Sequence, residues 1–287
     1  MGNCKTGLVL EGGAMRGMFT AGVLDVMMEE NIRLDMTVGV SAGALFGVNY
    51  LSGQKGRVIR YNKRFNGDKD YMGLRPLLFE GNIVNTSYAY DIVPRRLDPF
   101  DNEAFMKAEG EFYAVVTEMT TGKPEYIKIT NPFQQMDVLR ASGSLPFVSH
   151  PVTLDGKKYL DGGIADSIPF EWLMQQGCSR VVVILTRDLT YRKKPMSQRV
   201  VKLGYRKYPA LAEQMLRRHE VYNESVQKLI ELEKTGEVFV IRPSEPIEIG
   251  RMEKNPEKLQ EVYDLGVKDA GTQLQALREY LSDKQIN

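Results

Sequence analysis

Residues 6–17 of the chain read TGLVLEGGAMRG, a short apolar run that passes directly into a glycine-rich turn, and a helical stretch follows to about Asn31. Residues 35–43 read DMTVGVSAG, a second apolar run that ends in another tight turn, and residues 44–51 are apolar over a helical length. The order is therefore strand, glycine turn, helix, strand, tight turn and helix. This alternation predicts an α/β fold with a parallel sheet and helices on its faces.

The remainder of the chain continues this alternation without an internal repeat, a low-complexity segment or an interdomain linker. The expected strands are Glu111–Met119, Glu125–Thr130, Tyr159–Leu160, Arg180–Thr186 and Glu237–Ile241, and the expected helices are Gln134–Ser142, Ile168–Gln176, Pro209–Lys234 and Pro256–Leu281. The segment from Gln54 to about Phe105, rich in aromatic residues and prolines, is expected to be less regular. We predict one domain over residues 6–287, with a core over about 6–186 and a C-terminal strand and helices over about 205–287.

The composition is that of an ordinary globular protein. Among 287 residues, 38 lysines and arginines face 37 aspartates and glutamates, so the whole chain offers no general attraction for nucleic acid. Two cysteines and two histidines are too few for a disulfide framework or a zinc site of the usual ligand count. We therefore expect no metal and no nucleic-acid partner, and the sequence leaves the oligomeric state open.

The sequence contains few targeting signals. The chain has no apolar run near the ~20 residues that span a bilayer, and its first residues lack the pattern of a secretory signal. Residues 1–6, MGNCKT, fit the pattern for myristoylation of Gly2, with Cys4 as a second acylation site. That pattern is short and runs straight into a strand, so we favour an unmodified cytoplasmic protein.

A G-x-S-x-G sequence spans Gly39–Gly43 and places Ser41 between an expected strand and an expected helix. A serine on such a sharp turn has a strained backbone that only small neighbours tolerate, and its Oγ is pushed out beyond the sheet. The N-terminus of the following helix favours negative charge at the same point. We predict that Ser41 is a nucleophile. The alternative is an ordinary glycine-flanked turn, because the bare pattern often occurs by chance.

The glycine loop over Gly12–Gly17 follows the first strand, at the sheet edge where parallel sheets place their ligand sites. Glycines let backbone N–H groups approach an anion closely, so the loop is suited to an oxyanion site. A dinucleotide or phosphate cradle is the alternative. It is the weaker one, because the G-x-G-x-x-G spacing is absent and the second strand ends in Ser41 rather than an acid.

The proton acceptor for Ser41 is predicted to be a carboxylate. His150 lies in a turn and His219 within a basic helix, so neither follows a strand as a triad histidine usually does. Asp161 stands before Gly162 and Gly163, which allow a sharp turn that directs the carboxylate inward. The alternative is a simple Asp-Gly turn, which is common.

Together these three elements resemble the patatin-like phospholipase family, in which a G-G-G-x-R-G loop, a G-x-S-x-G serine and a D-G-[GA] aspartate form a Ser–Asp dyad without histidine. The matching stretches are residues 12–17, 39–43 and 161–163, and residues 141–146, ASGSLP, are similar to the small-residue stretch before the family's aspartate. The resemblance runs from about residue 6 to at least 186, and the strand at 237–241 with the helix that carries Gly266 is similar to the family's usual ending. One departure is Ala14 at the third loop glycine, where a positive φ becomes costly.

The resemblance implies a three-layer patatin-like fold with a mostly parallel central sheet and helices on both faces. It also implies a serine lipolytic acyl hydrolase that cleaves phospholipid or other fatty-acyl esters through an acyl-enzyme, without metal or cofactor. In this interpretation Asp161 accepts the Ser41 proton, and Arg16 fixes the loop by hydrogen bonds to carbonyls. The expected oxyanion donors are the amides of Gly12, Gly13 and Ala14, and the expected supporting residues are Arg16, Gly17, Gly39, Gly43, Gly162 and Gly163.

Two alternative functions stay open. The first is a small-ester esterase or thioesterase, whose activity falls rather than rises with acyl-chain length. The second is a non-catalytic protein that binds lipid or nucleotide on the same scaffold. A fluorophosphonate probe separates the second from an enzyme, because a binding module leaves Ser41 unlabelled.

Three peripheral segments carry further hypotheses. The stretch Arg187–Lys207 holds eight basic residues against one acid, Asp188, and leaves the sheet at the same edge as Ser41. It either attracts anionic headgroups, which gives peripheral membrane contact, or is a solvated loop, the alternative we slightly favour. The segment Tyr71–Tyr90 either covers the pocket and holds an acyl chain or forms a second core cluster. Arg57, Arg60 and Arg64, at helical spacing, are expected to form a solvated face.

Overall fold

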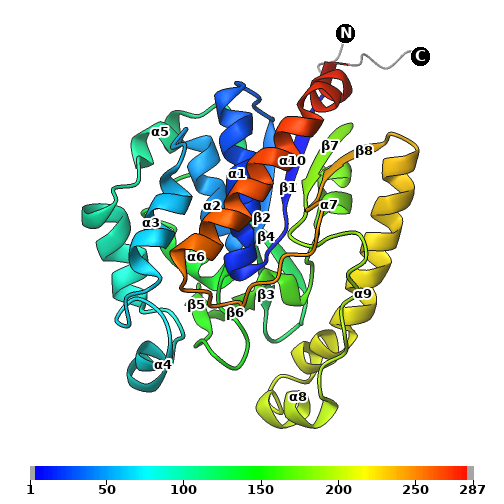
Figure 1. The fold of residues 1–287 in the computed structure, drawn as a ribbon. Coiled ribbons are helices and arrows are strands. Elements are labelled where there is room, and N and C mark those ends of the chain that lie inside the picture. The colour runs from blue at the N-terminus through cyan, green and yellow to red at the C-terminus, as the bar shows by residue number, and fades with distance from the viewer. Residues whose placement is uncertain (1–3, 283–287) are drawn as a thin grey trace.

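The computed structural model describes residues 4–282, which fold around an eight-stranded sheet (Figure 1). Five neighbouring strands are parallel, in the order β3 (Glu111–Glu118), β2 (Met36–Val40), β1 (Thr6–Leu10), β7 (Arg180–Ile184) and β8 (Val238–Ile241), with β8 at one edge. Antiparallel strands extend the sheet from β3, namely β4 (Pro124–Ile129), β6 (Lys157–Asp161) and β5 (Val152–Leu154). The mostly parallel sheet expected from the sequence is confirmed. Gly2, with its myristoylation pattern, lies outside the described residues.

Helices cover both faces of the sheet because its central strands are apolar on both sides. Leu8 and Leu10 of β1 belong to one buried cluster and Val9, between them, belongs to another, as alternation along a strand requires. The first cluster packs against α1 (Gly17–Glu29), α2 (Ala42–Leu51), α3 (Arg57–Phe65), α6 (Met136–Ser142) and α10 (Pro256–Ser282), and the second against α7 (Phe170–Gln175) and α9 (Pro209–Lys234). The three-layer arrangement is therefore confirmed.

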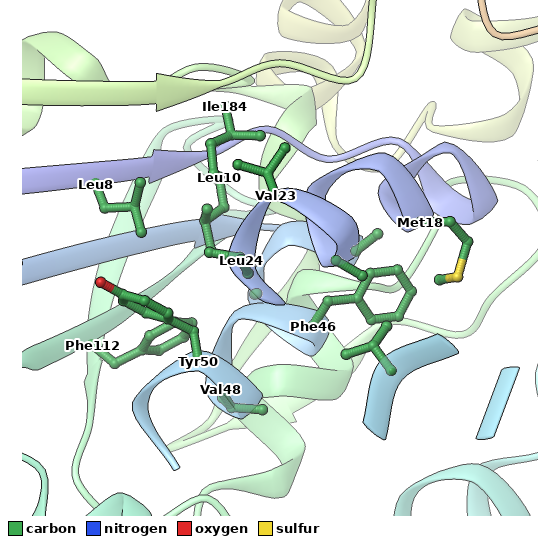
Figure 2. Close-up of a cluster of buried hydrophobic side chains, with 14 of the residues drawn as sticks. Leu8, Leu10, Met18, Val23, Leu24, Phe46, Val48, Tyr50, Phe112 and Ile184 are labelled. Atoms are coloured by element: carbon green, nitrogen blue, oxygen red, sulfur yellow. The ribbon is translucent and has the colours of Figure 1, made fainter. Parts of the chain in front are cut away.

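The core on the first face joins the two ends of the chain. Figure 2 shows Leu8, Leu10 and Ile184 of neighbouring strands facing side chains from α1 and α2. On the outer side of α1, the last helix packs at unusually close range. A Cβ on Gly266 of α10 would lie 2.2 Å from the carbonyl oxygen of Phe19 in α1, so only glycine permits this approach.

The segment after α2 is more regular than the sequence indicated. It contains α3, α4 (Leu74–Glu80), the π-helical segment η2 (Tyr88–Leu97) and α5 (Asn102–Lys107). A further helix, α8 (Gln198–Gly204), lies within the basic stretch. These helices are short, and η2 contains Pro94, so their apolar residues show too few turns of periodicity to reveal a helix.

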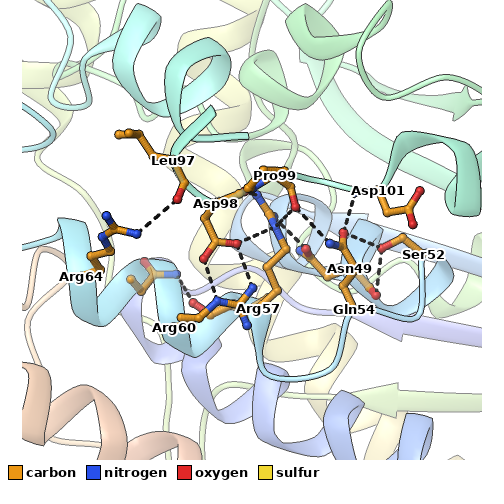
Figure 3. A network of polar contacts seen from close by, with 12 residues as sticks. Asn49, Ser52, Gln54, Arg57, Arg60, Arg64, Leu97, Asp98, Pro99 and Asp101 are labelled. Carbon is orange, nitrogen blue, oxygen red and sulfur yellow. Dashed lines mark hydrogen bonds and ion pairs between the residues drawn. The ribbon is translucent and has the colours of Figure 1, made fainter. Parts of the chain in front are cut away.

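The expectation of a solvated arginine face on α3 is wrong for Arg57, whereas Arg60 and Arg64 are exposed. Arg57 is only 5% exposed and donates hydrogen bonds to Asn49 Oδ1 at 2.9 Å and to the Asp98 carbonyl at 2.5 Å (Figure 3). Its Nε also lies 3.2 Å from the Asp98 carboxylate, which pairs with Arg60 as well. Arg64 donates to the Leu97 carbonyl. The three arginines thus attach α3 to the chain around Asp98, Arg57 from a buried position and Arg60 and Arg64 from the exposed side of the helix.

No helix within residues 4–282 is both long enough and apolar enough to cross a membrane.

Candidate active site

Ser41 occupies the turn between β2 and α2 in the strained conformation that its motif predicts. Its backbone has φ 55° and ψ −122°, a combination that costs free energy for any residue with a Cβ. The turn is held by its neighbours: the Ser41 N–H donates to Ser142 Oγ at 2.9 Å, and a Cβ on Gly43 would lie 2.2 Å from the Leu10 carbonyl oxygen. The Ser41 side chain lines a cavity of about 410 Å³ at the carboxyl ends of the parallel strands.

The glycine loop after β1 lies directly beside Ser41. A Cβ on Gly12 would lie 2.8 Å from the Ser41 Cβ, so glycine is required for this contact. Within the described residues, the amides of Gly12, Gly13 and Ala14 donate no hydrogen bond, although all three residues line the cavity. Ala14 has φ 50°, so the costly conformation anticipated for this departure from the glycine pattern is present. The loop offers three unused N–H donors next to a serine.

A buried carboxylate fixes this loop from behind. Glu11 accepts hydrogen bonds from the Thr186 N–H at 2.6 Å and from the Tyr222 hydroxyl at 2.8 Å. The Thr186 hydroxyl in turn donates to the Gly12 carbonyl at 3.0 Å. The ends of β1 and β7 and the helix α9 are thereby joined under the loop.

Asp161 ends β6 and is 2% exposed. Its main chain is held from two sides, because its N–H donates to the Ser144 carbonyl and its carbonyl accepts from the Thr117 hydroxyl, both at 2.9 Å. Its Oδ1 accepts the Gly163 N–H at 2.8 Å, while Oδ2 is buried without a hydrogen-bond partner in the described part of the chain. One carboxylate oxygen is therefore free to accept a proton.

The structure brings Ser41 and Asp161 to one cavity from positions 120 apart in the sequence. Burial raises the pKa of the Asp161 carboxyl, outweighing Arg218, the Ser41 hydroxyl, the Gly163 N–H and Lys193, which all lower this pKa. The Ser41 hydroxyl therefore lies close enough to the carboxylate to lower its pKa, although Oδ2 does not reach the geometry of a full hydrogen bond with any residue of the range 4–282. Such contacts often tighten only when a substrate is bound. A carboxylate of raised pKa is a better proton acceptor than a free one.

The prediction that Arg16 fixes the loop through carbonyl hydrogen bonds is wrong. Its side chain is 9% exposed, lines the cavity and donates no hydrogen bond to any described residue. Burial and the nearby Arg187 lower the pKa of Arg16 to about 10. Arg16 therefore contributes positive charge to the cavity rather than rigidity to the loop.

Further cavity residues could not be identified from the sequence. Arg218 and His219 come from α9 and Arg251 from the segment before α10, whereas Arg187, Arg192, Lys193 and Lys194 come from the first part of the basic stretch. The place of the basic stretch after a strand indicates from the sequence that it lies near the site, whereas Arg218 is one of several charged residues on a long helix and is not distinguished from the others. His219 lies with its Nδ1 2.8 Å from the Leu216 carbonyl oxygen, and within the described part of the chain it forms no hydrogen bond with Ser41 or Asp161.

A second, apolar cavity of about 160 Å³ also reaches Ser41. Its walls come from α2, α6, η2 and the segment 71–90, and include Leu45, Phe46, Leu139, Tyr71, Met72, Ile83, Val84, Ala89 and Tyr90. Part of the aromatic segment therefore lines a pocket beside the serine. Its helix α4 does not, because Leu74, Leu78 and Phe79 are exposed to solvent.

Fold and site together define the class: a three-layer α/β protein with a G-x-S-x-G serine at the carboxyl ends of a mostly parallel sheet. The family model for patatin-like phospholipase matches residues 8–174, more than half of the chain. The chain therefore belongs to the patatin-like phospholipase family. A second family model, described as a domain of unknown function, matches residues 208–282, and a single domain over residues 6–287 stays a prediction.

Three similar proteins illustrate the range of relatives. The uncharacterized protein YjjU of Escherichia coli (strain K12) is 29% identical over 270 residues, which cover 91% of this chain and 75% of that protein. Lysophospholipase NTE1 of Eremothecium gossypii is 27% identical over 192 residues, which cover 62% of this chain but only 12% of that protein. The crystal structure of VipD from Legionella pneumophila is 14% identical, with a TM-score of 0.46, and the match covers 96% of this chain and 67% of that one.

Proposed function

We propose that this protein is a serine lipolytic acyl hydrolase that cleaves phospholipid or other fatty-acyl esters. The observation that carries the proposal is the position of Ser41 between two cavities of opposite character. One is polar and contains Asp161 and the glycine loop, whereas the other is lined mostly by apolar side chains. A fatty-acyl ester has the same division, with an apolar chain on one side of its carbonyl and a polar alcohol on the other. Membership in the patatin-like phospholipase family and similarity to a protein named as a lysophospholipase support it.

The proposed reaction is acyl transfer to water. Asp161 accepts the Ser41 proton as Oγ attacks the ester carbonyl, and the amides of Gly12, Gly13 and Ala14 donate to the oxyanion that forms. The proton passes to the oxygen of the leaving alcohol, and an ester with Ser41 remains. Water then attacks this acyl-enzyme while Asp161 accepts its proton. Asp161 passes that proton to Ser41 Oγ as the acyl–oxygen bond breaks, which releases the fatty acid and restores Ser41.

The surroundings of the site support contact with an anionic membrane surface. In the basic stretch Arg187–Lys207, the helix α8 exposes 75% of Leu203 next to the exposed Lys202. The helix α4 exposes 79% of Leu78 and 80% of Phe79. Both helices project from the end of the molecule toward which the parallel strands run (Figure 1). Apolar tips beside basic residues suit a surface of anionic lipid.

The membrane contact is tested with vesicles of phosphatidylcholine that contain increasing fractions of phosphatidylglycerol. We expect binding to increase with the anionic fraction and to weaken with salt, because charges near the surface contribute ~1 kcal/mol each at most. Replacing Leu203 by serine weakens binding, whereas Leu189→Ser, in another exposed position, is the matched control. Binding that is indifferent to lipid charge and salt rejects this contact.

The catalytic proposal is tested with a fluorophosphonate probe and a fatty-acyl ester. We expect the probe to label the wild type at Ser41, and Ser41→Ala to lose both labelling and turnover. The matched control is Ser282→Ala, since that serine is exposed at the end of α10. A folded wild type that neither reacts with the probe nor hydrolyses any ester is instead a non-catalytic lipid-binding protein.

A further inference from the structure

The larger cavity carries far more positive than negative charge. Seven basic side chains line it: Arg16, Arg187, Arg192, Lys193, Lys194, Arg218 and Arg251. The acids in the same wall are Glu11 and Asp161. Glu11 already accepts hydrogen bonds from Thr186 and Tyr222, and Asp161 has its place beside Ser41. Hydrolysis of an uncharged ester gives no reason for this excess of cations.

These cations are not neutralised by the protein itself. Within residues 4–282, no ion pair joins Arg16, Arg187, Lys193, Arg218 or Arg251 to an acid. The Nε atoms of Arg16 and Arg218 are buried and have no hydrogen-bond partner in that range. A buried guanidinium without a partner is costly, because it has lost its water. Such groups are expected where a ligand supplies the missing anion.

Neighbouring rings hold two of the cations in place. The Lys193 ammonium lies 3.9 Å from the ring centre of Tyr222, and the Arg187 guanidinium lies 4.0 Å from that of Tyr191. A guanidinium nitrogen of Arg218 lies near the Gly163 position, where an added Cβ would be 3.0 Å away. The cations are therefore fixed at the wall that also carries Asp161.

Burial first, and then repulsion between neighbouring cations, lowers the pKa values of these groups. Burial, followed by the charge of Arg218, lowers the pKa of Lys193 to about 7. The pKa of Arg218 is also lowered by burial, although Asp161 raises it. An anion bound among these side chains would relieve this repulsion.

We propose that this cluster is a subsite for a phosphate monoester, so that the preferred substrates are acyl esters of glycerol phosphate whose phosphate carries no further headgroup. This specificity rests on the proposed ester hydrolysis at Ser41. A phosphate monoester carries about −1.5 to −2 charges near pH 7 and presents three acceptor oxygens. Arginine fits such oxygens with two parallel hydrogen bonds.

A choline or ethanolamine headgroup suits the cavity less well. Such a group reduces the phosphate to a single negative charge and brings its own cation among Arg187, Lys193 and Arg218. The acids of the cavity wall are occupied, as described above, and leave no carboxylate to pair with that cation among the described residues. The glycerol unit would connect the phosphate in this cluster to the ester carbonyl at Ser41.

The first test measures binding without catalysis. In the Ser41→Ala protein, calorimetry is expected to show binding of glycerol 3-phosphate and about tenfold weaker binding of glycerophosphocholine. Arg218→Gln is expected to weaken glycerol 3-phosphate binding about tenfold or more. The matched control is Arg217→Gln, the neighbouring exposed residue of α9, which does not line the cavity. Arg251→Gln is a second variant at an exposed position, in case the buried substitution prevents folding.

The second test distinguishes a lipid headgroup from a free phosphate. For a headgroup subsite, glycerol 3-phosphate inhibits hydrolysis of p-nitrophenyl butyrate competitively, and kcat/KM for an acyl-glycerol phosphate exceeds that for its choline ester by about tenfold or more. Inhibition that is not competitive indicates a free phosphate as effector and overturns the headgroup assignment. Equal kcat/KM for the two lipids, or no binding of glycerol 3-phosphate to Ser41→Ala, overturns the subsite while leaving the hydrolase intact. Phosphate binding without hydrolysis of any ester instead removes the proposed function alone.

Discussion

The apolar cavity beside Ser41 sets an expected dependence of activity on acyl-chain length. Its volume of about 160 Å³ is close to the ~150 Å³ of an apolar protein cavity that accommodates benzene, so it has room for on the order of six carbons. Burial of each methylene contributes ~0.8 kcal/mol, which corresponds to about a fourfold gain in kcat/KM. From acetyl to hexanoyl esters the gain is therefore roughly 200-fold, and longer chains should add little inside the cavity.

The assay is hydrolysis of a series of p-nitrophenyl esters at concentrations below their aggregation limit. Ala89→Phe, in the wall of the cavity, should shift the plateau to shorter chains, since the added ring occupies part of the volume. Leu74→Phe on the exposed face of α4 is the matched control and should leave the profile unchanged. Activity that falls with every added carbon would refute the assignment of this cavity to the acyl chain and favour a small-ester esterase.

Three substitutions test the energetics of the structure. Asp161→Asn should reduce kcat by about 10⁴-fold yet raise the melting temperature at pH 7. Burial raises the pKa of the Asp161 carboxyl, so its ionisation lowers the stability of the folded protein as pH rises from the ordinary aspartate pKa through the raised one. For the same reason, the acid limb of the wild-type pH profile of kcat/KM should have a pKa above that of an ordinary aspartate. An unchanged Tm in the variant, or an acid limb with a pKa near ~4, contradicts this. Ala14→Gly should raise the free energy of unfolding, measured in urea, by roughly 0.5–1 kcal/mol. The strain of a positive φ at alanine exceeds the entropic cost of glycine, so a lower free energy of unfolding would contradict this prediction. Arg57→Ala should destabilise by about 3 kcal/mol by removing a buried partner of Asp98, whereas the exposed Arg64→Ala should cost under about 1 kcal/mol; equal effects would contradict the network.

The parts of the fold that the sequence predicted well are those whose signal is local. The sequence predicts the strand β1 and the long helix α9 at their observed bounds, because a short apolar run that ends in a glycine turn, or seven helical turns, leaves little choice. The helices between α2 and β3 are not predicted as such by the sequence, since they are short and η2 contains Pro94. Arg57 shows the same limit in a single residue: its partner Asp98 lies 41 positions away, and only the folded chain joins them.

The residues of the candidate site also fall into those that a local sequence signal predicts and those that only the fold brings together. Ser41 and Asp161 were selected from motifs that combine a functional side chain with the small residues its turn requires, so the chemistry and the backbone signal coincide. No such signal accompanies Arg218 or Arg251. Their contribution to the site depends on lining the same cavity as Arg16 and Lys193, which only the fold brings about. The predicted role of Arg16 failed for a related reason. A motif gives the position of a charged residue, but whether it bonds to its own loop or faces a cavity depends on what lies opposite.

Backbone strain marks this cavity independently of any motif. Five residues other than glycine have a positive φ within residues 4–282, and three of them, Ala14, Ser41 and Phe147, line the larger cavity. Each such residue costs of order 1–3 kcal/mol, so it persists only where its surroundings impose it. Ser142 holds the Ser41 amide, and the Tyr205 hydroxyl accepts the Phe147 N–H at 3.0 Å. A chain that tolerates strain at three points around one cavity, and leaves the Nε atoms of Arg16 and Arg218 there without a partner among the described residues, has a wall shaped for a ligand at the expense of stability.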